Sequence, residues 1–165
     1  MDTVLPGLLA LAILLLASLS LGQSGLSSFE TLGASWQDAE QRTIERARSD
    51  IVITSINQGS GIVDVVIRND GDTPVSDFSH MDVVVQYQAG ATNYIKYIAF
   101  TTQSTPQPDD TWRVLSISND VIDPGVLNTA ESMTVRVTLN PAPSGGSHWL
   151  QITTELGISA SSFFT

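Results

Sequence analysis

The sequence has no cysteine, which excludes disulfides, thiolate metal sites and cysteine nucleophiles. It has only two histidines, His80 and His148, and neither stands in a pattern that pairs it with a serine nucleophile. No glycine-rich phosphate loop follows an expected strand and opens a helix. These absences predict a protein that is not an enzyme, has no catalytic residues and carries no cofactor.

Basic residues are also scarce. Seven Lys and Arg stand against 17 Asp and Glu, which gives a formal net charge of −10. Three of the seven, Arg42, Arg46 and Arg48, lie in one short segment. Binding of nucleic acid requires a basic surface that displaces counterions from phosphates, so nucleic acid is excluded as a partner. The acidic surface is typical of a soluble domain.

The acidic residues raise the question of a calcium site. A loop that begins at Asp120 has Gly125 and Glu131 at the spacings of a calcium-binding loop. Two of its ligand positions are, however, taken by Ile122 and Pro124. Aspartate also stabilises turns through its own side chain. The sequence therefore predicts no metal site.

The N-terminal segment has no charged residue from Thr3 to Phe29, and Val4 to Leu21 is almost wholly Leu, Ala, Ile and Val. Such a run is long enough to span a membrane as a helix. The acidic start at Asp2 does not fit a signal peptide. A simple anchor meets another difficulty, since the basic cluster follows the run and would place the remainder in the cytoplasm. We therefore favour a processed N-terminus whose helix packs against copies of itself.

Helical periodicity resumes after this run. Apolar or small residues recur at intervals of three and four along one face: Phe29, Leu32, Trp36, Ala39, Thr43 and Ala47. Asp38 and Arg42 are spaced to form an ion pair on a solvated face. A helix of this length is more than one small domain can cover. The pattern predicts a hydrophobic and then amphipathic helix over residues 1–49, followed by a separate domain over residues 50–165.

From Ile51 onward the period changes to two and β-branched residues dominate. Seven strands are expected: Ile51–Asn57, Gly61–Arg68, Met81–Gln88, Tyr94–Thr101, Trp112–Ser118, Ser132–Leu139 and His148–Glu155. Turn-forming residues separate them. The predicted fold class is α+β, with a long N-terminal hydrophobic α-helix followed by an all-β Ig-like sandwich of Greek-key topology.

This organisation resembles that of the archaellins, the type IV pilin-like filament subunits of the archaeal flagellum. The similarity includes Val65 through Pro74, Asp82 through Val85, Trp112 through Asp120, Asp123 through Asn128, and Glu131. Similar fragments occur in the archaellum-associated sandwich proteins that act as stator parts at the cell envelope. Bacterial type IV pilins carry glutamate at mature position five, where this chain has Leu5.

The resemblance implies a structural subunit of an extracellular motility filament, inserted in the membrane before assembly and delivered by a secretion and motor platform. Its partner would be itself, in a helical homopolymer. The residues expected to carry self-assembly lie on the helix: Leu5, Leu8, Leu9, Ala12, Ile13, Leu16, Leu19, Phe29, Leu32 and Trp36. Two alternatives stay open: a membrane-anchored stator protein that binds the envelope, and a subunit of an adhesive type IV pilus.

Overall fold

The computed structural model describes residues 4–165, and within the helix it does not describe the side chains of residues 4–6, 10, 17 and 19–30. The chain divides into two compact units, Met1–Thr43 and Ile44–Thr165, so the last turn of the helix belongs with the β domain. Each unit is considered by itself.

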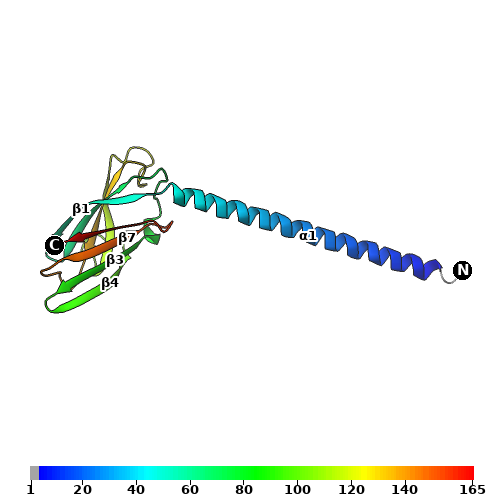
Figure 1. The fold of residues 1–165 in the computed structure, drawn as a ribbon, viewed down its shortest axis with the longest axis horizontal. Coiled ribbons are helices and arrows are strands. Elements are labelled where there is room, and N and C mark those ends of the chain that lie inside the picture. The colour runs from blue at the N-terminus through cyan, green and yellow to red at the C-terminus, as the bar shows by residue number, and fades with distance from the viewer. Residues whose placement is uncertain (1–3) are drawn as a thin grey trace. The chain divides into compact units, whose positions relative to one another are not determined.

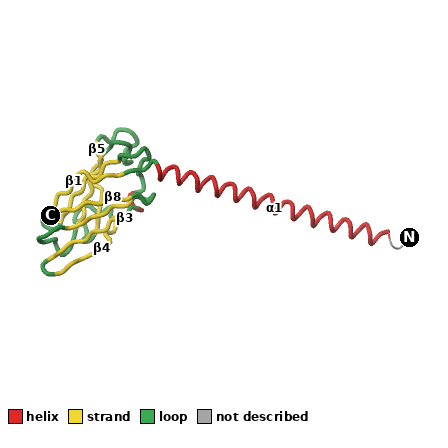
Figure 2. Tube along the Cα trace, in the orientation of Figure 1, coloured by secondary structure: helices red, strands yellow, loops and turns green. Residues whose placement is uncertain are grey.

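Helix α1 runs from Val4 to Ala47 (Figure 2). Its described side chains are apolar over residues 7–16 and mostly polar or charged from residue 37 onward. The long hydrophobic α-helix of the predicted fold class is therefore corrected to a helix whose described apolar part is short. The charges of the second segment lie on the helix surface, where the predicted pair of Asp38 and Arg42 forms at 3.1 Å. Among the side chains that are described, no helical stretch is both long and apolar enough for a membrane crossing.

Eight strands form the β domain (Figure 1). They are β1 (Ile51–Gly59), β2 (Ile62–Asn69), β3 (Asp82–Ala89), β4 (Thr92–Phe100), β5 (Thr111–Ser118), β6 (Ser132–Thr138), β7 (His148–Thr153) and β8 (Ser159–Phe164). The single turn of 3-10 helix η1 (Phe78–His80) precedes β3. The strand order is β1-β2-β6-β5-β4-β3-β7-β8.

This order separates into two antiparallel layers, β1-β2-β6-β5 and β4-β3-β7-β8. It corresponds to the immunoglobulin arrangement with one additional strand beside the third, which confirms the Ig-like sandwich. The layers join through a short parallel pairing of β4 with β5, where Phe100 lies opposite Trp112. At the other end of the order, β1 and β8 lie next to each other.

The core lies between the layers and follows the period of two. Val63, Val65 and Ile67 on β2 are fully buried, as their alternation predicts. Trp112 on β5 is the largest fully buried side chain, and its ring meets Phe100 edge to face at 4.9 Å between centroids. The domain therefore has a complete hydrophobic core of its own.

The eighth strand corrects the expectation of seven. Strand β8 has the sequence SASSFF, in which serine and alanine dominate and only two residues favour strands. It forms because β7 pairs with it along its whole length, from His148 opposite Phe164 to Thr153 opposite Ser159. Tertiary pairing here overrides a weak local preference.

The last turn of α1 is fastened to the β2–β3 loop. The amide of Asp72 donates to the carbonyl of Arg48 at 2.8 Å, and the hydroxyl of Thr73 donates to the carbonyl of Glu45 at 3.0 Å. The first bond satisfies a carbonyl just past the helix end, and the carbonyl of Glu45 also accepts from the hydroxyl of Ser49 at 2.7 Å. Arg48 and Asp72 add an exposed ion pair at 3.5 Å. Residues 44–50 are thus fixed to the sandwich.

Candidate functional site: the outer face of the β4-β3-β7-β8 sheet

The two sheets differ in what they present to solvent. On the β1-β2-β6-β5 sheet, one row across the outer face consists of Asn57, Asp64, Arg136 and Arg113. Arg136 binds Asp64 through two hydrogen bonds of 2.7 Å, and this carboxylate raises the pKa of the guanidinium. Arg113 donates to the amide oxygen of Gln107 at 3.1 Å. A face with charged and hydrogen-bonded side chains has the polarity of an ordinary solvated surface.

The equivalent row on the β4-β3-β7-β8 sheet has no charge. It consists of Ile95, Gln86, Trp149 and Phe163, each the register partner of the next. Ile95 is 73% exposed and Phe163 is 71% exposed. Ile95 lies on β4 and Phe163 on β8, the two edge strands of this sheet. Large apolar side chains at such exposure are typical of a contact surface.

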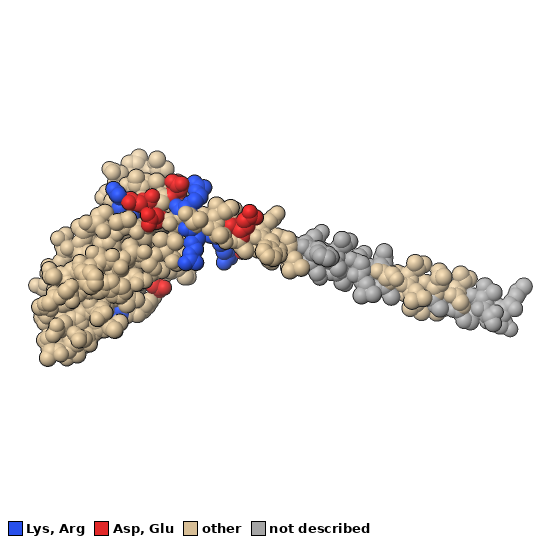
Figure 3. Space-filling model, viewed as in Figure 1, with Lys and Arg blue, Asp and Glu red and all other residues tan. Residues whose placement is uncertain are grey.

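The neighbouring row continues this character with Tyr97, Val84, Gln151 and Ser161. Tyr97 is 63% exposed, and its hydroxyl donates to Asp82 at 3.1 Å, which raises the pKa of the phenol. Figure 3 shows few charged groups on the side of the domain where β3, β4 and β7 lie in Figure 1. We call the eight residues of these two rows the uncharged face.

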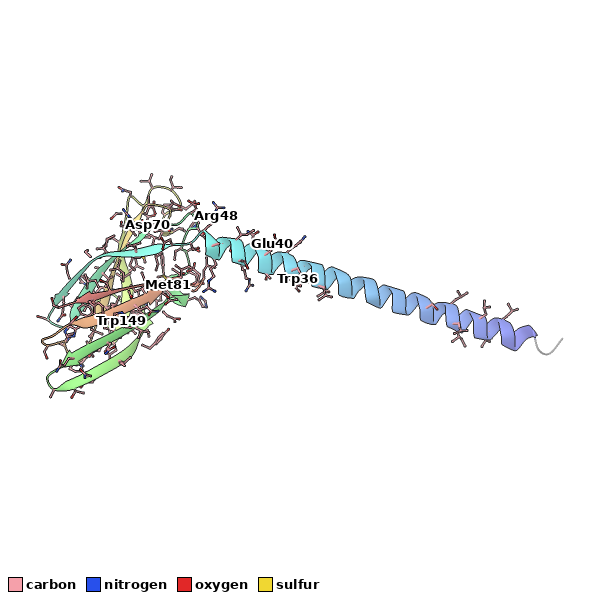
Figure 4. All side chains as sticks on the ribbon, in the orientation of Figure 1. Trp36, Glu40, Arg48, Asp70, Met81 and Trp149 are labelled. Carbon is pink, nitrogen blue, oxygen red and sulfur yellow. The ribbon has the colours of Figure 1, made fainter. Side chains whose placement is uncertain are left out.

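Part of the uncharged face is hollowed. A depression of about 360 Å³ is lined by Gln86, Tyr87, Gln88, Asn93, Ser147, Trp149 and Phe163. Trp149, labelled in Figure 4, lies between Gln86 and Phe163 in the register of the sheet. Rings and amides thus come together from β3, β4, β7 and β8.

The hollow has a fixed wall. Buried His148 accepts a hydrogen bond at Nδ1 from the amide of Gln88 at 3.3 Å and packs against Phe164. Ser144 holds the β3–β4 turn in two ways, because its amide donates to the carbonyl of Gln88 at 2.8 Å and its hydroxyl accepts from Gly90 at 2.7 Å. The hollow is therefore largely formed before any partner binds.

The residues predicted from the sequence lie elsewhere. Leu8, Leu9, Ala12, Ile13, Leu16, Leu32 and Trp36 are exposed on α1 in the single chain. The side chains of Leu5, Leu19 and Phe29 lie outside the described residues. The prediction that these residues carry self-assembly stays a prediction.

The other sequence candidates have structural partners. Asp120 accepts from the amide of Gly125 at 3.0 and 3.1 Å, and Glu131 accepts from the amide of Asn128 at 2.9 Å. Exposed His80 pairs with Asp77 at 2.6 Å. Within the described part of the chain no group of three or more potential ligands could hold a metal ion.

Sequence reasoning missed the uncharged face. The available signal was in β4, where Tyr94, Ile98 and Phe100 point toward the core and Ile95 and Tyr97 point away from it. A strand with apolar residues on both sides indicates that both sides meet something.

Fold and strand order define a protein with an immunoglobulin-like domain that follows an N-terminal helix. Residues 47–160 match the family described as conserved flagellar protein F, immunoglobulin-like domain. Because this match covers more than half of the chain, the chain belongs to that family.

One relative and two solved structures are similar to this chain. An uncharacterized protein of Archaeoglobus fulgidus is 30% identical over 132 residues, which cover 79% of this chain and 75% of the relative. The archaellum periplasmic stator protein FlaG from Sulfolobus acidocaldarius superposes with a TM-score of 0.53 at 19% identity, covering 70% of this chain and 99% of FlaG. The stator complex of FlaF and FlaG from the same organism gives 0.52 at 19% identity, covering 70% of this chain and 88% of that chain. At these identities the structures show the fold alone.

The archaeal flagellin FlaB1 from Methanocaldococcus jannaschii is more distant, with a TM-score of 0.49 and 13% identity over 71% of this chain and 89% of the flagellin. The family match by itself supports the expected association with the archaellum. The family that matches is described as flagellar protein F, and it is not the filament-subunit family that the sequence favoured.

Proposed function

We propose that this protein is a stator-type component of the archaellum, held at the cell envelope by α1, whose Ig-like domain binds a fixed component of the envelope through the uncharged face. Membership of the flagellar protein F family supports the assignment to the archaellum. The contrast between the outer faces of the two sheets carries the binding role.

With a net charge of −10, most of the surface repels any acidic partner, and burying a charged surface costs free energy unless each charge is paired. The uncharged face avoids both costs. Its exposed Ile95, Tyr97 and Phe163 supply apolar area of the kind found at the centres of protein interfaces.

The segment from Thr3 to Phe29, which has no charged residue, supports attachment of α1 to a membrane or to neighbouring helices. In the proposed role the protein performs no chemistry of its own. It resists the torque of the motor because both its helix and its domain are held.

The test is a matched pair of substitutions in cells that make the protein. Ile95→Asp places a carboxylate on the uncharged face at edge strand β4, and Thr134→Asp places one on the outside of central strand β6 of the other sheet. We expect cells with Ile95→Asp to assemble archaella but to lose most swimming, while cells with Thr134→Asp swim normally. Equal swimming of the two strains, with both proteins present at normal levels, contradicts the proposal.

A further inference from the structure

The hollow in the uncharged face has two kinds of lining, arranged in two adjacent rows. The ring row consists of Trp149 and Phe163 with the amide of Gln86 beside them. The amide row lies next to the ring row, nearer the β3–β4 turn. It consists of Gln88 and its register partner Asn93, together with Ser147, which precedes β7. Rings therefore stand directly beside donors and acceptors.

The chemistry of this lining selects among ligands. None of the seven residues is charged, so an ionic ligand would lose its hydration without gaining a counter-charge. A purely apolar ligand would leave the amides of Gln86 and Asn93 without partners. A neutral sugar meets both requirements, because its ring has an apolar C–H side for an aromatic face and hydroxyls that both donate and accept.

The polar groups are available for such a ligand. Gln88 donates through Nε2 to the carbonyl of Gly90 at 3.0 Å, which fixes its amide, and its Oε1 accepts no hydrogen bond from the described residues. The structure gives Gln86, Asn93 and Ser147 no side-chain hydrogen bond among the described residues. A volume of about 360 Å³ is at the lower end of the about 300–1,000 Å³ usual for small-molecule sites.

We propose that this hollow binds one neutral sugar residue carried by the envelope component on which the uncharged face docks. That the sugar belongs to an envelope component rests on the proposed function. That the ligand is a neutral sugar follows from the residues that line the hollow. Trp149 and Phe163 would pack against the C–H side of the ring, and Gln86, Gln88, Asn93 and Ser147 would bind its hydroxyls.

The test uses the full chain in a detergent without a sugar headgroup, because a glycosidic detergent would compete. The probes are the methyl glycosides of mannose, glucose and galactose, together with methyl glucuronide as the charged counterpart. Saturation-transfer NMR detects contact with ring C–H groups, and titration gives the affinity. At least one neutral glycoside is expected to bind and the glucuronide to bind about tenfold more weakly.

The variants separate the sugar from the protein interface. Phe163→Ala removes one ring, and Gln86→Leu removes one amide at nearly constant volume; each should weaken sugar binding by about tenfold or more. Ile95→Asp, outside the hollow, should bind sugar like the unaltered chain. Unchanged thermal unfolding of all three variants shows that the fold is intact.

The outcomes are distinct. If no glycoside binds, or if Phe163→Ala and Gln86→Leu bind as well as the unaltered chain, the sugar inference is wrong. If swimming still depends on Ile95 in that case, the docking face survives and its partner is recognised through protein alone. If sugar binds but Ile95→Asp swims normally, the hollow is a sugar site and the proposed docking function fails.

Discussion

A Cβ atom on Gly71 would lie 2.3 Å from the amide nitrogen of Asp50, a distance that side-chain carbons do not reach. The same atom would lie 2.6 Å from the carbonyl oxygen of Arg48. The β2–β3 loop therefore passes directly over the segment that joins α1 to β1, and only glycine permits the passage. Asp70 and Arg48, labelled in Figure 4, mark the two sides of this junction.

Substitution of Gly71 by alanine should destabilise the domain by about 1–3 kcal/mol, because backbone on both sides would have to shift. The measurement is chemical denaturation of the unaltered and substituted chains. Gly59→Ala is the control, since a Cβ at Gly59 meets no atom within 4 Å. An equal, small effect of the two substitutions would show that the close passage at Gly71 does not matter.

Asn69 is the buried centre of the same junction. Its Nδ2 donates to the carbonyls of Thr73 and Leu127 at 2.9 and 3.0 Å, and its Oδ1 accepts from the amide of Gly71 at 3.0 Å. Asn69→Ala leaves these groups without partners and should cost about 2–4 kcal/mol in the free energy of unfolding. Exposed Asn57→Ala should cost little. A loss below about 0.5 kcal/mol for Asn69→Ala would contradict this account of the loop.

Trp112 and Trp149 offer a comparison of buried and half-exposed indoles. Trp112 is fully buried against Phe100, so Trp112→Ala should cost about 3–5 kcal/mol through lost contacts and a cavity. Trp149→Ala, on the outer face, should cost clearly less. Thermal and denaturant unfolding of both variants measures the difference. A reversed order would mean that Trp149 serves the core rather than the surface.

Asp77 provides a pH prediction. The hydroxyl of Ser79 and then the ring of His80 bind its carboxylate, and together they lower its pKa below the ordinary value. A lowered pKa in the folded state means that the contact stabilises the fold above the ordinary pKa of aspartate, about 3.9, and is lost as the pH falls through the lower folded value.

Carboxyl NMR titration checks this directly. Ser79→Ala should move the pKa of Asp77 upward, and by more than His80→Gln does, because the serine hydroxyl is the larger cause. Ser162→Ala, on β8, should leave it unchanged. If the pKa of Asp77 does not change in Ser79→Ala, the serine hydroxyl is not a cause of the lowered pKa.

The sequence predicted the sandwich because β-branched residues alternate clearly in most strands, as in Val63, Val65 and Ile67. It failed at Ser159–Phe164, where pairing with β7 and not local composition makes the strand. It also did not reveal the uncharged face, since the row from Ile95 to Phe163 joins four strands whose order only the fold establishes.

The choice between filament and stator could not be made from the residues. An apolar helix followed by an Ig-like domain is common to both interpretations, and the ten helix residues expected to carry self-assembly would be apolar in either. The distinction depends on what surrounds the helix and the uncharged face, which periodicity does not report.

The most direct test of the stator assignment is to shear archaella from cells that make this protein and to measure where the chain is found. The account predicts that it stays with the cell bodies and their envelope, and that the sheared filaments consist of other proteins. Recovery of this chain as the main protein of the filaments would contradict the account and restore the filament-subunit interpretation.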